Sequence, residues 1–353
     1  MTGSGTRIRL LLLSIVSISG LTASRAQDLS GYSPVATTET PSGLILALGL
    51  DCCREGSDAL ALLHKGGEEI LGFAAKASRQ VEVTLIVDPL GLPWARKQLG
   101  KTTRVKVVPI PINGSWIRDY GPIWLEKKLD PKATRALFDL KYYPMFRPLD
   151  DLLPARLAEY FRLPIVKTAP NSPGQLEGGN FQVDDGLGFS ASSSGKLSGP
   201  VQAILSRMGC TKVQALKSIP GEDSQHLDMF VMLAHGKRAF LADFSAATDK
   251  ERKQAMEENA AALTGLGCRI INLPAPSPRL NQITGTFLVF ESYANSVLFG
   301  DVAFVPEYGR PEDELARKVF EGEGFKVMMI PARNLAELGG GLHCVSAERR
   351  RSR

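Results

Sequence analysis

The sequence predicts a single α/β domain in which five similar units close into a ring. Strands that end at a proline recur 50 to 59 residues apart, and each follows a helical stretch. These strands are Val105–Pro111, Leu163–Pro170, Lys212–Pro220, Arg269–Pro276 and Phe325–Pro331; the helices before them are Trp94–Leu99, Asp151–Phe161, Pro200–Met208, Thr248–Leu266 and Pro311–Glu321. The third and fourth units also share a Gly-Cys turn, at Gly209-Cys210 and Gly267-Cys268. Each unit buries a face only against its neighbours, so we expect a closed ring.

Two hairpins support the same repeat. In each, a glycine-containing turn separates two apolar runs, which is the pattern of a tight β-turn. The turns are Asp185-Gly186, between Phe181–Val183 and Leu187–Ser190, and His235-Gly236-Lys237, between Met229–Leu233 and Ala239–Ala242. The first strand of the domain is expected at Leu44–Leu50.

The chain divides into a signal, a leader and one domain. Of its 353 residues 44% are hydrophobic and 22% charged, which suits a globular protein with a sizeable core. Residues 1–26 predict a secretory signal, because Arg7 and Arg9 precede a short apolar run and Ser24-Arg25-Ala26 offers small residues for cleavage. We expect residues 27–42 to be a flexible leader and residues 43–350 to form the domain. The mature protein would then be secreted or periplasmic, cleaved near Ala26, with no membrane attachment.

Charge and cysteine content narrow the range of partners. Loss of the three arginines in the signal lowers the formal charge from +5 to about +2, so the basic excess does not indicate nucleic-acid binding. The five cysteines would allow two disulfides in an exported protein. Cys52 and Cys53 are adjacent, and Cys210 and Cys268 occupy matching core positions. We therefore expect no structural disulfide.

The loops that follow the five prolines carry an unusual set of side chains. Equivalent loops of a closed ring meet at one end of its axis, so these groups are expected to converge. In chain order they are Trp116 and Asp119 in Asn113–Pro122, Glu177 in Leu176–Asn180, His226 and Asp228 in Gln225–Asp228, Asn295 in Ser292–Ser296, and Cys344 in Leu338–Ala347. A thiol, an imidazole, an amide and three carboxylates would thus share one site.

Cys344, His226 and Asp228 have informative neighbours in the sequence. Three glycines precede Cys344 closely, which predicts a tight loop that delivers the thiol to a site, although a small buried residue at the start of a strand fits as well. His226 and Asp228 are two residues apart, so in an extended run both side chains leave the same face. By the same rule His343 would point away from Cys344.

Several kinds of chemistry find no support. The single useful histidine and the cysteine are far apart and no C-x-x-C or H-x-x-x-H occurs, so we expect no metal. The nucleophile elbow of serine hydrolases, the G-x-G-x-x-G loop and the P-loop are absent, and we expect no cofactor. Cys–His chemistry with surplus carboxylates remains, which favours a cationic substrate over a protease. Trp116 and Asp119 could grip a planar cation, or Trp116 could be structural beside an Arg118–Asp119 surface pair.

Five stretches, in order along residues 113–346, resemble the guanidine-modifying (pentein) superfamily, in the branch of the agmatine deiminases and the Porphyromonas-type peptidylarginine deiminase. They are Trp116–Pro122, Glu177–Asn180, His226–Asp228, Ser292–Asn295 and Gly340–Cys344. The resemblance implies a five-bladed α/β propeller of ββαβ units. It also implies that Cys344 is the nucleophile, His226 the general acid and base, and Asp119 and Asp228 the guanidinium ligands. Asn295 would lie at the site and Glu177 would support His226.

The departures from that family bear on the substrate. Gly114 stands where the family usually has Asp, and the Trp-rich block typical of the start of agmatine deiminases is missing near Leu44–Arg54. The segment Phe146–Asp151 resembles the part of the peptidylarginine branch that carries arginines for a substrate carboxylate, so Arg147 is a candidate substrate ligand. A basic loop at a helix entry would also explain the segment.

These inferences predict an enzyme that hydrolyses a guanidino group to a ureido group and ammonia through a covalent thiouronium. The expected partner is an arginine peptide or a small guanidino compound, with arginine converted to citrulline. An agmatine deiminase, which would yield N-carbamoylputrescine, is the first rival function. Two less favoured functions are amidino transfer to an amine and guanidino binding without catalysis, and the second disagrees with the intact set Cys344, His226, Asp119 and Asp228.

Overall fold

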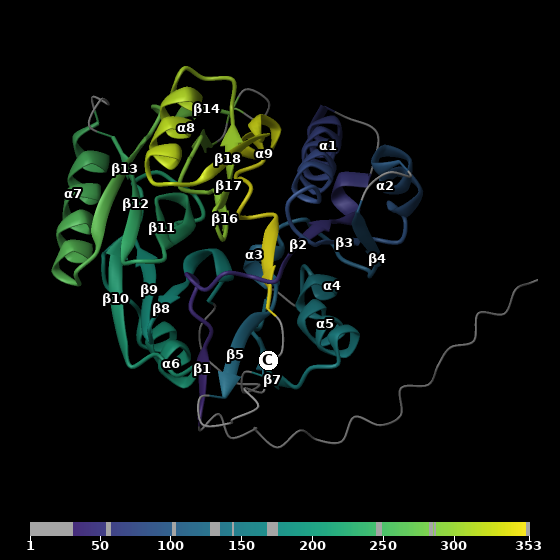
Figure 1. Cartoon of the computed structure of the whole chain (residues 1–353), viewed down its shortest axis with the longest axis horizontal. Helices are drawn as coiled ribbons and strands as arrows, with labels where there is room; N and C mark the ends of the chain where they lie inside the picture. The colour runs from purple at the N-terminus through teal and green to yellow at the C-terminus, as the bar shows by residue number, and fades with distance from the viewer. Residues whose placement is uncertain are drawn as a thin grey trace, which may run out of the picture.

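The computed structural model describes residues 31–53, 58–100, 104–127, 135–142, 145–167, 176–244, 249–281, 285 and 287–350. The predicted signal, residues 1–26, lies outside this part of the chain. Within the described residues, five sheets of three or four strands surround a common centre (Figure 1). The predicted ring of ββαβ units is therefore confirmed.

Each unit is a hairpin followed by a helix and a strand parallel to the second hairpin strand. In chain order four units are β5 (Ile123–Lys127), β6 (Arg135–Asp139), α5 (Leu153–Phe161), β7 (Ile165–Lys167); β8 (Gln182–Asp184), β9 (Leu187–Ser192), α6 (Gly199–Arg207), β10 (Lys212–Lys217); β11 (Val231–Ala234), β12 (Arg238–Asp243), α7 (Lys250–Gly265), β13 (Arg269–Pro274); and β16 (Val297–Phe299), β17 (Val302–Glu307), α8 (Glu312–Gly322), β18 (Lys326–Pro331).

The fifth unit joins the two ends of the domain. The C-terminal strand β19 (Ser346–Arg349) pairs antiparallel with β2 (Gly43–Leu48), with Ser346 opposite Leu46. The unit continues through α1 (Asp58–Ala77) and β3 (Val83–Val87), and α2 (Leu92–Leu99) and β4 (Val105–Pro109) extend it. This pairing closes the ring and carries the turn that holds Cys344, just before β19, to the centre.

A helix of one unit can cover the outer strand of the unit before. The side chain of Asn259 in α7 accepts from the backbone nitrogen of Lys217 and donates to its carbonyl, both at 2.8 Å, and so takes the place of a neighbouring strand at the edge of β10. β2 and β3 are buried along their whole length, as suits central parallel strands between two packed layers. The remaining short elements are β1 (Tyr32–Pro34), α3 (Ile117–Tyr120), α4 (Pro148–Asp151), β14 (Arg279–Leu280), β15 (Leu288–Val289), α9 (Arg333–Glu337) and the 3-10 turns Leu50–Cys53, Gly178–Asn180 and Leu227–Met229.

Two expectations about the N-terminal part need correction. The helix and strand equivalent to those of the other units are α1 and β3, whereas the predicted pair Trp94–Leu99 and Val105–Pro111 corresponds to the additional α2 and β4. The described part of the expected leader makes regular contacts with the domain: Tyr32–Pro34 pairs with β5, and Glu39 forms an ion pair with Arg135 at 2.8 Å.

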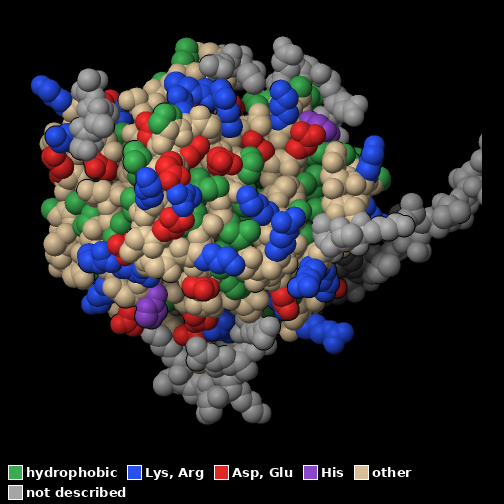
Figure 2. All heavy atoms as spheres, turned by 45° about the horizontal axis from the view of Figure 1, so that its top comes forward, with side chains coloured by type: hydrophobic (Ala, Val, Ile, Leu, Met, Phe, Trp, Pro, Cys, Tyr) green, Lys and Arg blue, Asp and Glu red, His purple; other side chains and the backbone are tan. Residues whose placement is uncertain are grey.

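The structure describes the thiols of four of the five cysteines and the charge pattern of one face. Cys52, Cys210, Cys268 and Cys344 are free thiols. Figure 2 shows Lys and Arg mixed with Asp and Glu across one face of the molecule. In the described part of the chain, no helix has the length and apolar character needed to cross a bilayer.

Candidate active site

The side chains singled out in the sequence come from five separate loops and meet at the centre of the ring. Asp119 lies in the single-turn helix α3, Glu177 directly precedes the turn Gly178–Asn180, and His226 directly precedes the turn Leu227–Met229, which contains Asp228. Asn295 follows β15, and Cys344 lies in the turn before β19. Each loop leaves a sheet at the same end of the ring, which is why residues more than 200 positions apart share one site.

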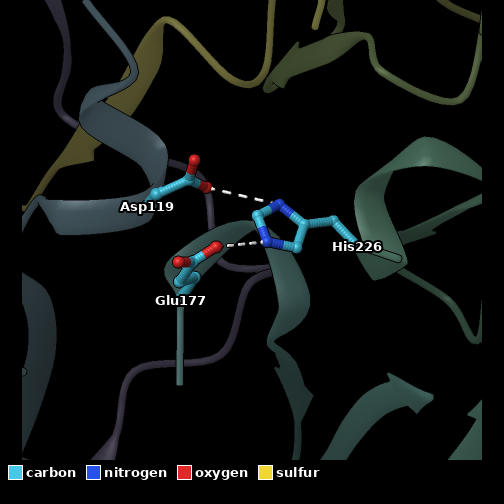
Figure 3. Close-up of side chains that lie close together, drawn as sticks. All are labelled: Asp119, Glu177 and His226. Atoms are coloured by element: carbon cyan, nitrogen blue, oxygen red, sulfur yellow. Dashed lines mark hydrogen bonds and ion pairs between the residues drawn. The ribbon is translucent and has the colours of Figure 1, made fainter. Parts of the chain in front are cut away.

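His226 lies between two carboxylates (Figure 3). Its Nε2 is 2.6 Å from Glu177 Oε2, and its Nδ1 is 3.5 Å from Asp119 Oδ1. Burial lowers the pKa of this imidazole, but the negative charges of Asp119, Glu177 and Asp228 outweigh burial and raise the pKa to about 10. The ring is therefore a cation at neutral pH.

Asp119 and Asp228 each present one buried oxygen that has no hydrogen-bond partner among the described residues, in both cases Oδ1. Burial, followed by the charges of Glu177 and Asp228, raises the pKa of Asp119 to about 7 in spite of the nearby His226. An unpartnered buried carboxylate oxygen is costly. The arrangement therefore lacks a donor, and a planar cation with several N–H groups would supply it.

Gly179 is needed for this arrangement. A β-carbon at this position would lie 2.6 Å from His226 Nδ1, 2.7 Å from Asp119 Oδ1 and 3.3 Å from Asp228 Oδ2. Three functional atoms thus surround one point that any larger side chain would fill. The glycine lets the backbone approach the site closely.

Cys344 is buried beside Asn295 and Asp228. Its Sγ lies 3.2 Å from Asn295 Nδ2 and 4.0 Å from Asp228 Oδ2. Asn295 also holds the loop, because its Oδ1 accepts from the backbone nitrogen of His343 at 2.9 Å and its Nδ2 donates to the carbonyl of Asp228 at 3.2 Å. Burial and the charges of Asp228 and Asp119 raise the pKa of the thiol well above its usual range. The thiol is therefore neutral among these groups.

Trp116 faces the same loop. A β-carbon on Gly340 would meet both the indole ring of Trp116, at its Cη2 (3.0 Å), and Cys344 Cβ (3.1 Å). Trp116 is half-buried and packs against three of the hydrophobic clusters of the core. The alternative of an Arg118–Asp119 surface pair is wrong, since Arg118 instead binds Glu348 with both terminal nitrogens, at 3.0 and 2.9 Å.

Arg147 lies at the entrance to α4 beside Gly114. Its side chain is 37% exposed, and its Nη1 is 3.6 Å from the buried Asp150 Oδ2. A β-carbon on Gly114 would collide with this same Nη1, so the glycine that departs from the family makes room for the arginine. Asp150 fixes the loop by accepting from the backbone nitrogens of Asn113 and Gly114.

Two expectations about histidines are wrong. His226 and Asp228 share the site, but through the 3-10 turn Leu227–Met229 and not through an extended run. His343 does not point away, because residue 343 lies in a turn; its Nδ1 is 2.7 Å from Asp228 Oδ2. The roles of His343 and of the Arg118–Glu348 pair were not predicted from the sequence. The sequence marked them only by position: Arg118 precedes Asp119, His343 precedes Cys344, and Glu348 lies in the strand that follows.

Metal ligation is also compatible with part of this centre. Asp119, Glu177 and His226 bring candidate ligand atoms within 4.8 Å of one another. The same groups suit a guanidinium, which needs acceptor oxygens in one plane and brings its own positive charge.

A ring of five α/β units with a thiol, a protonated imidazole and an excess of carboxylates at its centre defines a cysteine-dependent enzyme for a cationic substrate. The sequence profile of the Porphyromonas-type peptidyl-arginine deiminase family matches residues 53–349, and the chain belongs to this family. It is therefore a hydrolase that acts on a carbon–nitrogen bond of a guanidino group.

Similar proteins agree with this assignment. A Marinomonas sp. (strain MWYL1) protein and a Legionella pneumophila (strain Paris) protein, both named "Putative agmatine deiminase", are 24% and 26% identical to the chain, each over 79% of this chain and 85% of their own length. The agmatine deiminase of Enterococcus faecalis superimposes with a TM-score of 0.77 at 18% identity, covering 94% of this chain and 99% of that one. The C. jejuni agmatine deiminase gives 0.75 at 19% identity, covering 93% and 99%. At these identities the superpositions show the fold.

Proposed function

We propose that the enzyme converts the guanidino group of arginine, free or at a peptide terminus, to a ureido group with release of ammonia. The observation that carries this proposal is the pair of carboxylates Asp119 and Asp228, each with a buried Oδ1 that has no hydrogen-bond partner among the described residues; Oδ2 of Asp228 is 4.0 Å from the sulfur of Cys344. A guanidinium seated between them would satisfy both oxygens with N–H donors. Its central carbon would then face the sulfur.

Substrate binding would also ionise the thiol. Burial and the charges of Asp228 and Asp119 keep the thiol of Cys344 neutral. A guanidinium cancels these charges, because it remains a cation at any pH at which the enzyme is folded (pKa above about 12). The pKa of the thiol then falls, its proton leaves to solvent, and the thiolate forms only when substrate is present.

The chemical steps use His226 twice. The thiolate attacks the guanidinium carbon and forms a C–S bond. Protonated His226 then gives its Nδ1 proton to the departing amino group, so the C–N bond breaks and ammonia leaves a covalent thiouronium. Neutral His226 next takes a proton from water as the water oxygen attacks the same carbon. The C–S bond breaks, the thiolate returns, and the hydroxyl proton of the adduct passes to solvent as the ureido product is released.

Glu177 fixes the imidazole for both steps, because its bond to Nε2 leaves Nδ1 facing the site. Asn295 holds the sulfur and the loop around it. Nucleophile, proton carrier and cation ligands are thus all supplied by these side chains.

Arg147 supports arginine over agmatine as the substrate. Burial and the charges of Asp119 and Glu177 raise the pKa of Tyr142, whereas the charge of Arg147 lowers it. Tyr142 therefore lies within electrostatic range of both the site and Arg147. A cation near the site suits the α-carboxylate of arginine, which agmatine lacks. Agmatine remains the second candidate substrate because of the relatives named for that activity.

The test is a colorimetric ureido assay of the purified mature protein with free arginine, agmatine, and peptides that contain internal or C-terminal arginine. We expect ureido product and equimolar ammonia from arginine substrates with a free carboxylate. Preference for agmatine would show that the substrate is agmatine and not arginine. A product that forms only when an amine acceptor is added would indicate amidino transfer, and no product from any substrate would refute catalysis.

We further propose that the enzyme is exported, from the arginine-led apolar run and Ser24-Arg25-Ala26 in the sequence. The mature protein should begin at Gln27. Intact-mass analysis of the protein from its native host tests this, and material that retains Met1 would contradict it.

A further inference from the structure

A second buried imidazole lies at the site and takes no part in the steps above. His343 is 7% exposed, and its Nδ1 is 2.7 Å from Asp228 Oδ2. That oxygen is the one 4.0 Å from the sulfur of Cys344, whereas Oδ1 of the same carboxylate has no partner among the described residues. His343 therefore engages one oxygen of Asp228 and leaves the other available.

The opposite side of the His343 ring faces a fixed ion pair. Its Nε2 is 3.9 Å from Glu348 Oε1, and Glu348 is bound by both terminal nitrogens of Arg118. Burial would raise the pKa of Glu348, but the charge and hydrogen bonds of Arg118 hold it well below its usual range. Glu348 is thus a permanent anion in a fixed place.

Arg118 also holds the backbone of His343 and of the next residue, Cys344. Its Nε donates to the carbonyl of His343 at 3.4 Å, and its backbone nitrogen donates to the carbonyl of Cys344 at 3.0 Å. The backbone nitrogen of His343 is bound by Asn295 Oδ1. The ring is therefore fixed by its backbone, by Glu348 on one side and by Asp228 on the other.

We propose that His343 is a positioning residue for Asp228, which sets the orientation of the carboxylate that receives the guanidinium. This inference rests on the proposed function. The terminal torsion of an aspartate is broad and roughly two-fold, so a free carboxylate rotates easily. A hydrogen bond from Nδ1 to Oδ2 stops this rotation, and so holds Oδ2 beside the sulfur and Oδ1 in one fixed place.

Two polar variants separate the two nitrogens of the ring. In His343→Asn the side-chain amide reaches the place of Nδ1 and can still donate to Asp228. In His343→Gln the amide reaches the place of Nε2, on the side of Glu348. We expect His343→Gln to lower kcat/KM roughly ten- to a hundred-fold, the range of one hydrogen bond to a charged group, mainly through a higher KM. His343→Asn should stay within about five-fold of wild type.

The split between KM and kcat distinguishes positioning from a structural role. A variant that only damages the fold lowers the active fraction, so its apparent kcat falls while KM stays the same. His235→Gln, in the turn between β11 and β12, is the matched control for a histidine outside the site. Circular dichroism should show all three variants folded.

The inference is overturned if His343→Gln keeps the wild-type KM, or if His343→Asn loses as much as His343→Gln. Failure of the proposed function gives a different result, because wild type itself would then form no ureido product. Should His343→Gln fail to fold, His343→Leu against His343→Asn makes the same comparison, with the same expected rise in KM for the leucine variant.

Discussion

Arg118 and Asp119 are neighbours in the sequence, but their side chains have opposite surroundings. Arg118 belongs to a paired layer of the site, where Glu348 binds it through two hydrogen bonds and cancels its charge. Asp119 belongs to an acidic layer, where carboxylates outnumber the one imidazolium. Its Oδ1 is 3.5 Å from His226 Nδ1 but has no hydrogen-bond partner among the described residues, and Glu177 and Asp228 add to the negative charge around it.

The difference separates charges that hold the fold from charges that await a ligand. The paired layer fixes the backbone on either side of Cys344 and is complete by itself. The acidic layer costs stability, which is tolerated where binding of a cation offsets it. Removal of single charges from either layer tests this contrast.

The largest effect is expected at the nucleophile. Cys344→Ser should lower kcat at least about 10⁴-fold, because an alcohol in this environment gives no nucleophilic anion. Its melting temperature should match that of wild type. Cys210→Ala and Cys268→Ala are the controls, and their turnover should be unchanged. Residual activity near wild type in Cys344→Ser would refute the covalent route.

Removal of a charge from the acidic layer should lower activity but raise stability. Asp119→Asn should lower kcat/KM roughly thirty- to several-thousand-fold, the range for one partner of a buried charge pair. The same variant should be more stable than wild type above pH 7. The pKa of Asp119 is raised from 3.8 to about 7 on folding, so its ionisation opposes folding; this cost is absent below pH 3.8 and complete above pH 7.

Thermal unfolding between acidic and mildly basic pH measures this. The gain in melting temperature of Asp119→Asn over wild type should shrink as the pH falls towards 3.8. A variant less stable than wild type above pH 7 would show that Asp119 belongs to the paired layer.

Removal of a paired charge should do the reverse. Glu348→Gln leaves Arg118 buried without its anion and should lower the free energy of unfolding by about 3 kcal/mol. Denaturant unfolding measures this difference. Unchanged stability would mean that the pair does not hold the Cys344 loop.

The smallest effect is expected at the rim. Arg147 is partly exposed and only loosely paired with Asp150, so a substrate carboxylate could still bind it. Arg147→Ala should lower kcat/KM roughly ten- to a hundred-fold for substrates with a free carboxylate, and little for agmatine. Arg147→Lys should restore part of the loss, because lysine lacks the planar fork. An equal loss on all substrates would assign Arg147 to the support of the Gly114 loop.

The side chains around Cys344 were easier to predict from the sequence than the paired layer. They lie in short motifs after the proline-ended strands, and the repeat itself predicts that these loops converge; they are Cys344, His226, Asp119, Asp228, Glu177 and Asn295. His343 and Glu348 could not be placed in this way. Their contacts depend on a turn at residues 342–345 and on the pairing of β19 with β2, which joins the two ends of the domain.

The protonation state of the thiol could not be predicted from the sequence either. A protonated histidine near a cysteine suggests a thiolate, but the sum of burial and two carboxylates reverses the direction of the pKa shift. Only the packed arrangement shows which charges lie nearer to the sulfur.

The central claim is that the carboxylates of Asp119 and Asp228 steer a planar cation onto Cys344. Alkylation by 2-chloroacetamidine, a cation, and by chloroacetamide, its neutral analogue of similar shape, tests it most directly. Intact-mass and peptide analysis should show chloroacetamidine modifying Cys344 alone, and much faster than chloroacetamide does, with most of this preference lost in Asp119→Asn. Equal rates for the two reagents, or modification of Cys210 or Cys268 in place of Cys344, would contradict the account.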